Sequence, residues 1–196
     1  MKKISKIIVF SLIFAFVLMG YTERSTHAAF KYKPGDIVVT NSTSSSGIVG
    51  HTGIVIDSNT ILHTSGWKSE PYPLTISIKK WTDRYGSTKV TRPDSAAKGE
   101  AAAKAAVKYF KGKKINYKIT TNPRDIDPNT YCSELVWYAY YKAGYPIKYP
   151  KWNHKDGIIT GWYTPGAGSL VKPYDFIDKT IMDNSTNKFT IVDNKW

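Results

Sequence analysis

Cysteine is nearly absent from this sequence of 196 residues, which contains a single one, at position 132. A lone thiol has no partner for an intramolecular disulfide, so no disulfide framework holds this fold. In an exported chain such a thiol is buried and inert, paired with another chain, or used chemically. Acidic residues are also scarce, with 15 Asp and Glu against 28 Lys and Arg. This excess of positive charge favours an anionic partner or simply serves solubility.

No apolar run reaches the roughly 20 residues that a membrane-spanning helix needs. The longest run covers residues 7–19, follows the basic segment 1–6, and precedes the small-residue sequence Thr-His-Ala at 26–28. This order is typical of a cleaved secretory signal peptide, and a retained membrane anchor is the alternative. We predict that residues 1–28 are removed and that residues 29–196 form a single secreted domain without stable membrane insertion. The cell wall is one place where such a protein would act.

Cleavage at this point changes the charge of the chain only slightly. It removes four of the Lys and Arg and one of the Asp and Glu, which lowers the net charge from +13 to +10. Outside a cell, the anionic partners are wall polymers, membrane surfaces or nucleic acid. The sequence contains no zinc-finger spacing, no phosphate-binding glycine loop and no other nucleic-acid motif. We therefore expect anionic cell-wall polymers as partners and no nucleic acid.

The first half of the domain is predicted to form mainly strands. Runs rich in β-branched residues indicate strands at 35–40, 51–57 and 60–65. A turn at 57–59 joins the last two as a hairpin, which places His51 and His63 on neighbouring strands. Residues 66–93 predict one further strand, around Ile76-Ser77-Ile78.

The second half of the domain is predicted to contain two helices, followed by less regular structure. The Ala/Lys-rich residues 95–111 predict a surface helix with Asp94 as its N-cap. A second helix is predicted from about Tyr131 to Gly144, because apolar residues recur there at core-facing spacing. Residues 145–168 predict a loop, and residues 169–193 predict one or two strands.

Cys132 falls at the predicted start of the second helix. Unpaired amides and the helix dipole at a first turn stabilise negative charge, so this position predicts a lowered thiol pKa. An adjacent imidazole would lower that pKa further by accepting the proton. The alternative is a buried structural cysteine that packs like a small hydrophobic residue.

We predict that His51 and His63 are the proton-transfer partners of Cys132. A general base needs its far ring nitrogen held by a polar group, so that the near nitrogen faces the nucleophile. We predict that His51 is the base and that His63 holds it, although a lone histidine at position 51 would more often be a core or surface residue. Zinc binding by the three side chains is a further alternative, but their spacing fits no compact zinc pattern and no fourth ligand is evident. We expect no metal and no other cofactor.

Three motifs resemble a known family. Residues 50–56 read GHTGIVI, residues 61–63 read ILH, and residues 131–138 read YCSELVWY. These motifs resemble the base strand, orienting strand and nucleophile helix of the NlpC-type papain-like hydrolases, whose nucleophile motif usually reads Asp-Cys-Ser-Gly-Leu-Val. In the common arrangement the cysteine precedes both histidines, whereas here it follows them by 81 and 69 residues. This order resembles the circularly permuted branch, the YiiX/YebB-like hydrolases, related in layout to lecithin retinol acyltransferase.

The resemblance covers roughly residues 33–145 and implies the fold. It implies an α+β, papain-like NlpC-type fold, circularly permuted, in which an antiparallel β-sheet or partial barrel packs against helices and the nucleophile begins a helix. Residues 112–117, GKKINY, resemble the family segment whose tyrosine lies beside the cysteine. Tyr117 would then donate its hydroxyl to the oxyanion together with the Cys132 amide, or would be an ordinary core aromatic. Glu134 replaces the glycine of the common family, although the permuted branch tolerates glutamate there. The usual Trp-Gly-Gly after the tyrosine is missing, which predicts a different substrate pocket.

The resemblance also implies a reaction. We expect a secreted cysteine hydrolase in which Cys132, His51 and His63 form a triad and pass through a thioester acyl-enzyme. The expected substrate is an amide bond of peptidoglycan stem peptides. Permuted relatives also act on acyl or lipid substrates, so an acyl-directed thiol hydrolase or transferase is an alternative, and a non-catalytic wall-binding module is another. The aromatic residues at 149–154 and 162–163 would line a sugar or acyl site, or pack a loop onto the core.

Overall fold

The computed structural model describes residues 30–43, 49–184 and 186–196, and its contacts group residues 31–196 into one unit. The predicted signal peptide at 1–28 lies outside the described residues.

The strands are β1 (Ile37–Thr40), β2 (His51–Val55), β3 (Thr60–His63), β4 (Leu74–Ser77), β5 (Thr88–Pro93), β6 (Asn116–Tyr117), β7 (Asn129–Thr130), β8 (Tyr149–Asn153), β9 (Ile158–Tyr163) and β10 (Phe189–Lys195). The helices are α2 (Ile78–Arg84), α3 (Ala96–Phe110), α4 (Cys132–Lys142), the 3-10 helix η1 (Pro173–Ile177) and α5 (Lys179–Met182).

Six of the strands form one antiparallel sheet, in the order β10-β5-β1-β2-β3-β4. The predicted hairpin is confirmed, because β2 pairs with β3 and Ile54 lies opposite Leu62. The β-branched residues of β1 and β2 suit a sheet that is covered on both sides, and both strands are buried along their whole length. Two further pairs of strands, β6–β7 and β8–β9, form separate two-stranded sheets.

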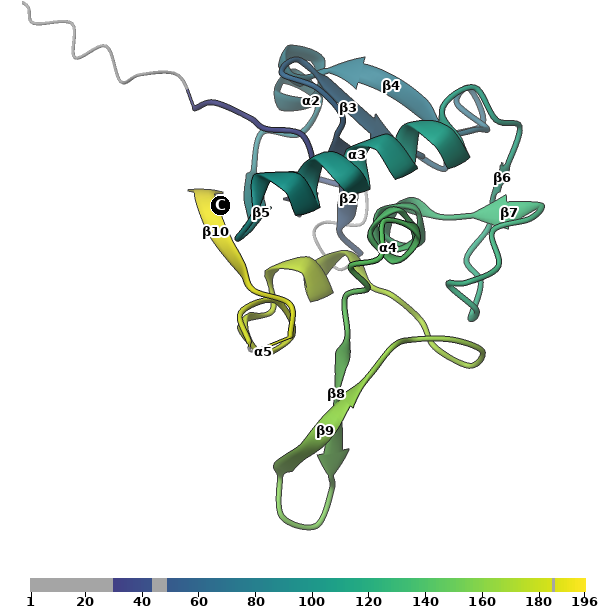
Figure 1. Cartoon of the computed structure of the whole chain (residues 1–196). Coiled ribbons are helices and arrows are strands. Elements are labelled where there is room, and N and C mark those ends of the chain that lie inside the picture. Colours follow the sequence, from purple (N-terminus) through teal and green to yellow (C-terminus); the bar gives the residue numbers. More distant parts are fainter. Residues whose placement is uncertain (1–29, 44–48, 185) are drawn as a thin grey trace, which may run out of the picture. The chain divides into compact units, whose positions relative to one another are not determined.

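Helices α3 and α4 pack against each other and against β2 (Figure 1). Alternating side chains of the strands, among them Ile37, Ile54 and Leu62, join the helices in one hydrophobic cluster. Helix α4 is buried from Cys132 to Tyr140, which is typical of a core helix and holds its first residue rigidly. Among the described residues, no helix combines the length and apolar character needed to cross a membrane.

The first turns of α3 lie close to another backbone segment. The N-cap residue is Ser95, so the prediction of Asp94 is wrong, and the Asp94 carboxylate instead accepts a 2.7 Å bond from Lys98. Gly99 faces the turn at Gly35, where a Cβ on Gly99 would come within 2.5 Å of the Pro34 carbonyl oxygen. The glycine in this Ala-rich helix therefore permits the helix to lie against the turn.

Helix α2 is absent from the sequence prediction, which placed only a strand in residues 66–93. Strand β4 forms as predicted, but it ends at Ser77, and the prediction of strand at Ile78 is wrong. Ser77 is the N-cap of α2, and its hydroxyl accepts a 3.1 Å bond from the Lys80 amide. Trp81 is the buried residue of this short helix. The serine cap and the buried tryptophan four residues later outweigh the strand propensity of the isoleucines.

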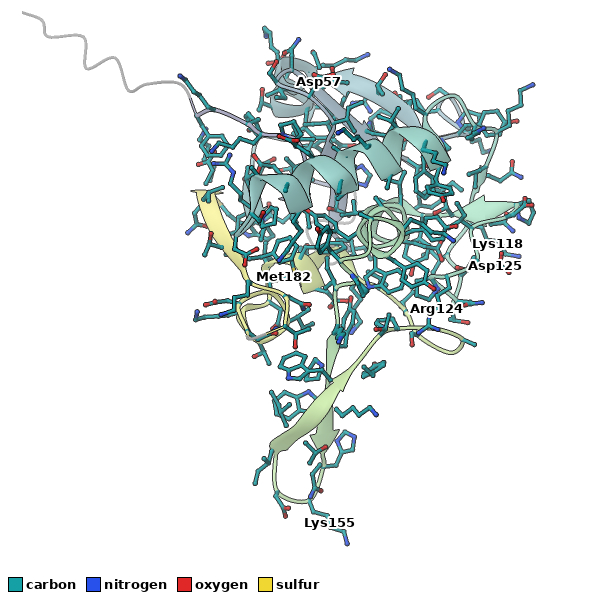
Figure 2. All side chains as sticks on the ribbon, in the orientation of Figure 1. Asp57, Lys118, Arg124, Asp125, Lys155 and Met182 are labelled. Carbon is teal, nitrogen blue, oxygen red and sulfur yellow. The ribbon has the colours of Figure 1, made fainter. Side chains whose placement is uncertain are left out.

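The C-terminal third also differs from the prediction. Residues 145–168, predicted as a loop, contain the antiparallel pair β8–β9, and residues 169–196 contain η1, α5 and the single strand β10. Figure 2 shows the β8–β9 hairpin projecting from the sheet and helices, with Lys155 near its tip. The hairpin exposes Trp152 and Ile158.

Candidate functional site

Cys132 is the first residue of α4, and the extended backbone of Tyr131 forms the N-cap. The thiol is buried, which opposes pairing with another chain, and α4 packs here against β2. Two hydrogen bonds tie this turn to the segment before η1. The Ser133 hydroxyl donates a 2.9 Å bond to the Val171 carbonyl, and the Val171 amide donates a 3.1 Å bond to the Tyr131 hydroxyl.

Burial governs the ionisation of the Cys132 thiol. It raises the pKa of the thiol, and the amides of Thr52, Ser133 and Cys132, which favour the thiolate, offset this effect only in part. The lowered thiol pKa predicted from the helix position is therefore wrong, because loss of water around the sulfur outweighs the first-turn amides. Thr52 directly follows His51, so its contact with the thiol puts the sulfur beside the start of β2.

The two predicted histidines meet across the β2–β3 hairpin. His51 Nε2 lies 2.9 Å from His63 Nδ1, and both side chains are buried. Gly53 makes this contact sterically feasible, since a Cβ there would come 2.7 Å from Ile61 Cγ2 and 3.2 Å from His63 Cβ. Residues two apart share one face of a strand, so the missing side chain at position 53 leaves room for the two rings.

Helix α2 forms the wall behind the histidines. The Trp81 ring stacks on His51 with a centroid distance of 5.4 Å, and the Tyr85 ring lies 5.3 Å from His51. Trp81 also meets His63 edge-on, and its Nε1 donates a 3.2 Å bond to the Thr88 hydroxyl. Sequence reasoning missed both aromatic residues. The signal that would have found them is an aromatic pair four residues apart behind a serine cap.

Both imidazoles are neutral at neutral pH. Burial lowers the pKa of His63 to about 4, and the field of Glu70 opposes that effect. Burial, followed by His63 and Arg84, lowers the pKa of His51 well below 6.5. Arg84 and Glu70, which sequence reasoning also missed, form a bidentate ion pair at 2.9 and 2.8 Å. A neutral imidazole is the form that can accept a proton from the thiol.

Tyr117 lies beside the nucleophile because β6 pairs in parallel with β7, with Tyr117 opposite Thr130, two residues before Cys132. Burial raises the pKa of the Tyr117 hydroxyl, and the charge and hydrogen bonding of Cys132 raise it further. Gly66, at φ +73°, packs under the Tyr117 ring, where a Cβ would come within 2.9 Å. The hydroxyl is therefore a protonated donor near the sulfur.

The structure brings together the four residues that the sequence singled out, although their roles stay predictions. Among the described residues, no hydrogen bond joins the Cys132 thiol to the His51 ring. Such bonds are often long before substrate binds. Because His51 Nε2 is engaged by His63, Nδ1 is the ring nitrogen that remains to accept a proton.

Two cavities open at the site and share Val49, Gly50 and Tyr117. The cavity of about 450 Å³ reaches His51, and its remaining lining mixes polar and apolar surface: Ser42, Thr43, Ser65, Arg84, Trp67 and Tyr85. The cavity of about 280 Å³ reaches Cys132, and its remaining lining is largely apolar: Ile119, Tyr131, Leu170, Val171, Pro173 and Tyr174, with Ser133 and Lys172. The site thus has an apolar side at the sulfur and a side of mixed polarity at the imidazole.

Glu134 lies in the first turn of α4 and is fully buried. Its Oε1 accepts a bond from the Thr120 hydroxyl, and no partner satisfies Oε2 among the described residues. Burial raises the pKa of Glu134 to about 7 even though the hydrogen bond from Thr120 lowers it. The carboxyl group connects the segment that follows Tyr117 to the nucleophile helix.

Other candidates from the sequence lie away from this site. The aromatic residues of 149–154 and 162–163 belong to the β8–β9 hairpin and line neither cavity. Within the described part of the chain, no group of three or more His, Cys, Asp or Glu side chains is arranged to hold a metal ion.

The residues just described define a thiol site with a histidine pair, at the junction of an antiparallel sheet and a buried helix. The chain belongs to the family of LnsA-like lipoprotein N-acylation proteins, whose model matches residues 3–154. The finer resemblance to YiiX/YebB-like hydrolases stays a prediction, as does the papain-like permuted fold.

One curated relative is an uncharacterized 30.3 kDa protein of Bacillus thuringiensis. It is 35% identical over 132 residues, which are 61% of this chain and 48% of the relative. The chain thus spans about half the length of that protein. No solved structure matches the chain.

Proposed function

We propose that this protein transfers an acyl group from a lipid ester to an amine through a thioester on Cys132, and that the amine is the N-terminus of a lipoprotein. The grouping of Cys132, His51, His63 and Tyr117 carries the proposal, because these side chains supply a nucleophile, a base and an oxyanion donor. The family description, which names lipoprotein N-acylation, supports acyl transfer as the reaction class.

The first half-reaction forms the thioester. His51 Nδ1 accepts the thiol proton as the Cys132 sulfur attacks the carbonyl carbon of the donor ester, and a C–S bond forms. The carbonyl oxygen becomes an oxyanion, to which the Tyr117 hydroxyl and the Cys132 amide donate. The ester C–O bond then breaks, and His51 gives its proton to the departing alcohol.

The second half-reaction transfers the acyl group. The acceptor amine attacks the thioester carbonyl, an amide bond forms and the C–S bond breaks. His51 takes a proton from the attacking nitrogen and returns it to the Cys132 sulfur. Water in place of the amine would give the free acid, so exclusion of water decides between transfer and hydrolysis.

His63 sets the tautomer that these steps require. For Nδ1 of His51 to accept a proton, the His51 hydrogen must lie on Nε2 and be donated to His63 Nδ1 across the 2.9 Å contact. The same bond persists after His51 is protonated, so the imidazolium keeps its orientation. His63 is therefore a positioning residue in this scheme.

Peptidoglycan amide hydrolysis, predicted from the resemblance, would use the same thioester chemistry. The two reactions differ in the acyl donor, which would be a stem-peptide amide in the hydrolysis and a lipid ester in the transfer. Export and wall association, predicted from residues 1–28 and from the charge, likewise remain predictions. A wall-binding module without catalysis would need none of the proton-transfer geometry.

The test supplies both substrate classes to one set of proteins. The protein is mixed with a phospholipid carrying a labelled acyl chain and a peptide bearing an N-terminal S-diacylglyceryl cysteine, and in parallel with purified wall sacculi. Mass spectrometry should detect the N-acylated peptide. Product formation should fall at least about 10³-fold in Cys132→Ala and about 10²-fold in Tyr117→Phe, while Lys104→Ala on the exposed side of α3 is the surface control.

Two results would contradict the proposal. One is a Cys132→Ala protein as active as the parent. The other is release of stem peptides from sacculi without acyl transfer, which would favour the amidase.

A further inference from the structure

The cavity at Cys132 has the chemistry of an acyl-chain site. The thiol opens into a space of about 280 Å³ walled by Ile119, Leu170, Val171 and aromatic rings. Such walls offer few hydrogen bonds to a peptide or a sugar, whereas apolar surface favours a hydrocarbon chain. The polar groups of the site lie on its other side, around His51.

The rim of this cavity exposes three aliphatic side chains to solvent. Val49 is 56% exposed, Ile119 is 58% exposed and Leu170 is 43% exposed, and all three line the same cavity. Scattered exposed aliphatic residues need no explanation, but a cluster around one opening marks a binding surface. Here the opening leads directly to the only thiol of the chain.

Two of the aromatic rings that line the cavity are held in place by their neighbours. The Tyr174 ring lies against Gly50, where a Cβ would come 2.6 Å from the ring. The Tyr131 hydroxyl is held by the Val171 amide, so that ring is fixed as well. A wall of fixed rings limits how much of a chain can enter.

We propose that this cavity holds the hydrocarbon chain of the acyl donor, with the acyl carbonyl at Cys132 and the polar remainder of the lipid in the cavity beside His51. This assignment rests on the proposed function and adds its substrate class, a lipid with a medium or long acyl chain. A methylene group occupies about the volume of a water molecule in the liquid, roughly 30 Å³, so the cavity encloses on the order of nine such groups. Longer chains extend past the aliphatic rim.

The reaction geometry agrees with this direction of binding. The two cavities meet at Val49, Gly50 and Tyr117, so an ester carbonyl at the junction lies near the Tyr117 hydroxyl. The chain then lies on the sulfur side, and the leaving alcohol lies on the side of His51, which must protonate it.

The test measures acylation of Cys132 by intact-protein mass spectrometry, with a series of p-nitrophenyl esters from acetyl to palmitoyl. The second-order rate should rise by up to about fourfold for each added methylene and level off near nine or ten carbons. In the double variant Ile119→Ser/Leu170→Ser, the ratio of the decanoyl to the butyryl rate should fall about tenfold. The matched control is Ile158→Ser on β9, an equally exposed aliphatic residue (59%) outside both cavities.

A second readout separates this assignment from the proposed function. Binding of free fatty acids to the Cys132→Ala protein, measured by calorimetry, should show the same dependence on chain length and the same loss in the double variant. Two results would overturn the acyl-chain site. One is acylation or binding that does not depend on chain length, and the other is a double variant in which the ratio of the decanoyl to the butyryl rate is unchanged. Chain-selective binding without any acyl-Cys132 would support the site and overturn the thioester mechanism.

Discussion

Two opposing influences act on the ionisation of the Cys132 thiol. The helix start and the Thr52 amide favour the thiolate, but burial raises the pKa of the thiol above its ordinary value. Since both imidazoles are also neutral near pH 7, the resting site consists of a thiol and an imidazole and not of a thiolate–imidazolium pair. The nucleophile is then formed only as His51 accepts its proton.

Alkylation of Cys132 tests this resting state. The rate of reaction with iodoacetamide should be low at pH 7 and should rise continuously towards pH 9 and above, because only the thiolate reacts. The same thiol in urea-unfolded protein is the reference and should react faster at pH 7. A rate plateau between about pH 5 and 7 would instead reveal a preformed ion pair.

Gly53 is the residue on which the histidine pair depends. Gly53→Ala would place a Cβ against Ile61 and His63, so we expect a loss of about 1–3 kcal/mol in the free energy of unfolding. Activity should fall with it, because His63 would no longer hold His51. Urea denaturation measures the stability. The control is Gly161→Ala in β9, where an added Cβ meets nothing within 4 Å, and an equal loss in both variants would contradict this role.

Glu134 adds a pH dependence to stability. Its pKa is about 7 in the folded protein and 4.5 in the unfolded reference. Between these pH values the unfolded chain releases a proton that the folded chain retains, so this carboxyl lowers the free energy of unfolding as pH rises from 4.5 to 7, by up to about 3 kcal/mol. Above pH 7 the contribution stays constant.

The variant Glu134→Gln isolates this contribution, since the buried histidines titrate nearby with the opposite sign. The difference in unfolding free energy between variant and parent should move in favour of glutamine as pH rises from 4.5 to 7. Urea denaturation at half-unit pH steps measures it. A difference that does not change with pH would show that the carboxyl is not perturbed.

At the scale of elements, the packing of α3 depends on the glycine inside it. Helix propensity alone favours alanine over glycine by about 1 kcal/mol. We expect the reverse for Gly99→Ala, because its Cβ would meet the Pro34 carbonyl oxygen at 2.5 Å. Thermal unfolding should show a lower midpoint for Gly99→Ala and little change for Lys104→Ala on the exposed side of the helix. A stabilised Gly99→Ala would contradict the close approach.

The elements that carry the thiol and the histidines were predictable from the sequence for local reasons. Strands β2 and β3 are short β-branched runs around a tight turn, and α4 has apolar residues at helical spacing, so local pattern and tertiary packing agree. Tyr117 was found by another route, through the family motif and not through local pattern. These elements supply the four residues on which the proposed reaction depends.

The missed elements have two causes, which are tertiary contacts that override local pattern and residues that disfavour strands. Helix α2 is short, and its burial of Trp81 against the histidines decides its form. Strands β8 and β9 contain proline and glycine, and for this reason their residues were predicted to form a loop. The thiol pKa was wrong because burial cannot be read from position within a helix. Arg84 and Glu70 are far apart in sequence, and only the fold pairs them.

At the scale of the whole molecule, the thiol lines an apolar cavity that adjoins a second cavity of mixed polarity, on a chain with a strong excess of Lys and Arg. Positive charge would attract the protein to anionic lipid surfaces and to anionic wall polymers alike. The charge therefore does not separate the two substrate classes. The covalent intermediate does, because a lipid donor leaves a fatty acyl group on the sulfur and a stem peptide leaves a peptidyl group.

The most direct measurement is the intact mass of the protein after mixing with a phospholipid donor in the absence of an acceptor amine. We predict a gain of one fatty acyl group, located on the peptide that contains Cys132, removed by neutral hydroxylamine and discharged when the acceptor peptide is added. The Cys132→Ala protein should show no such gain. An unmodified parent protein, or an equal adduct on Cys132→Ala, would contradict acyl transfer through this cysteine.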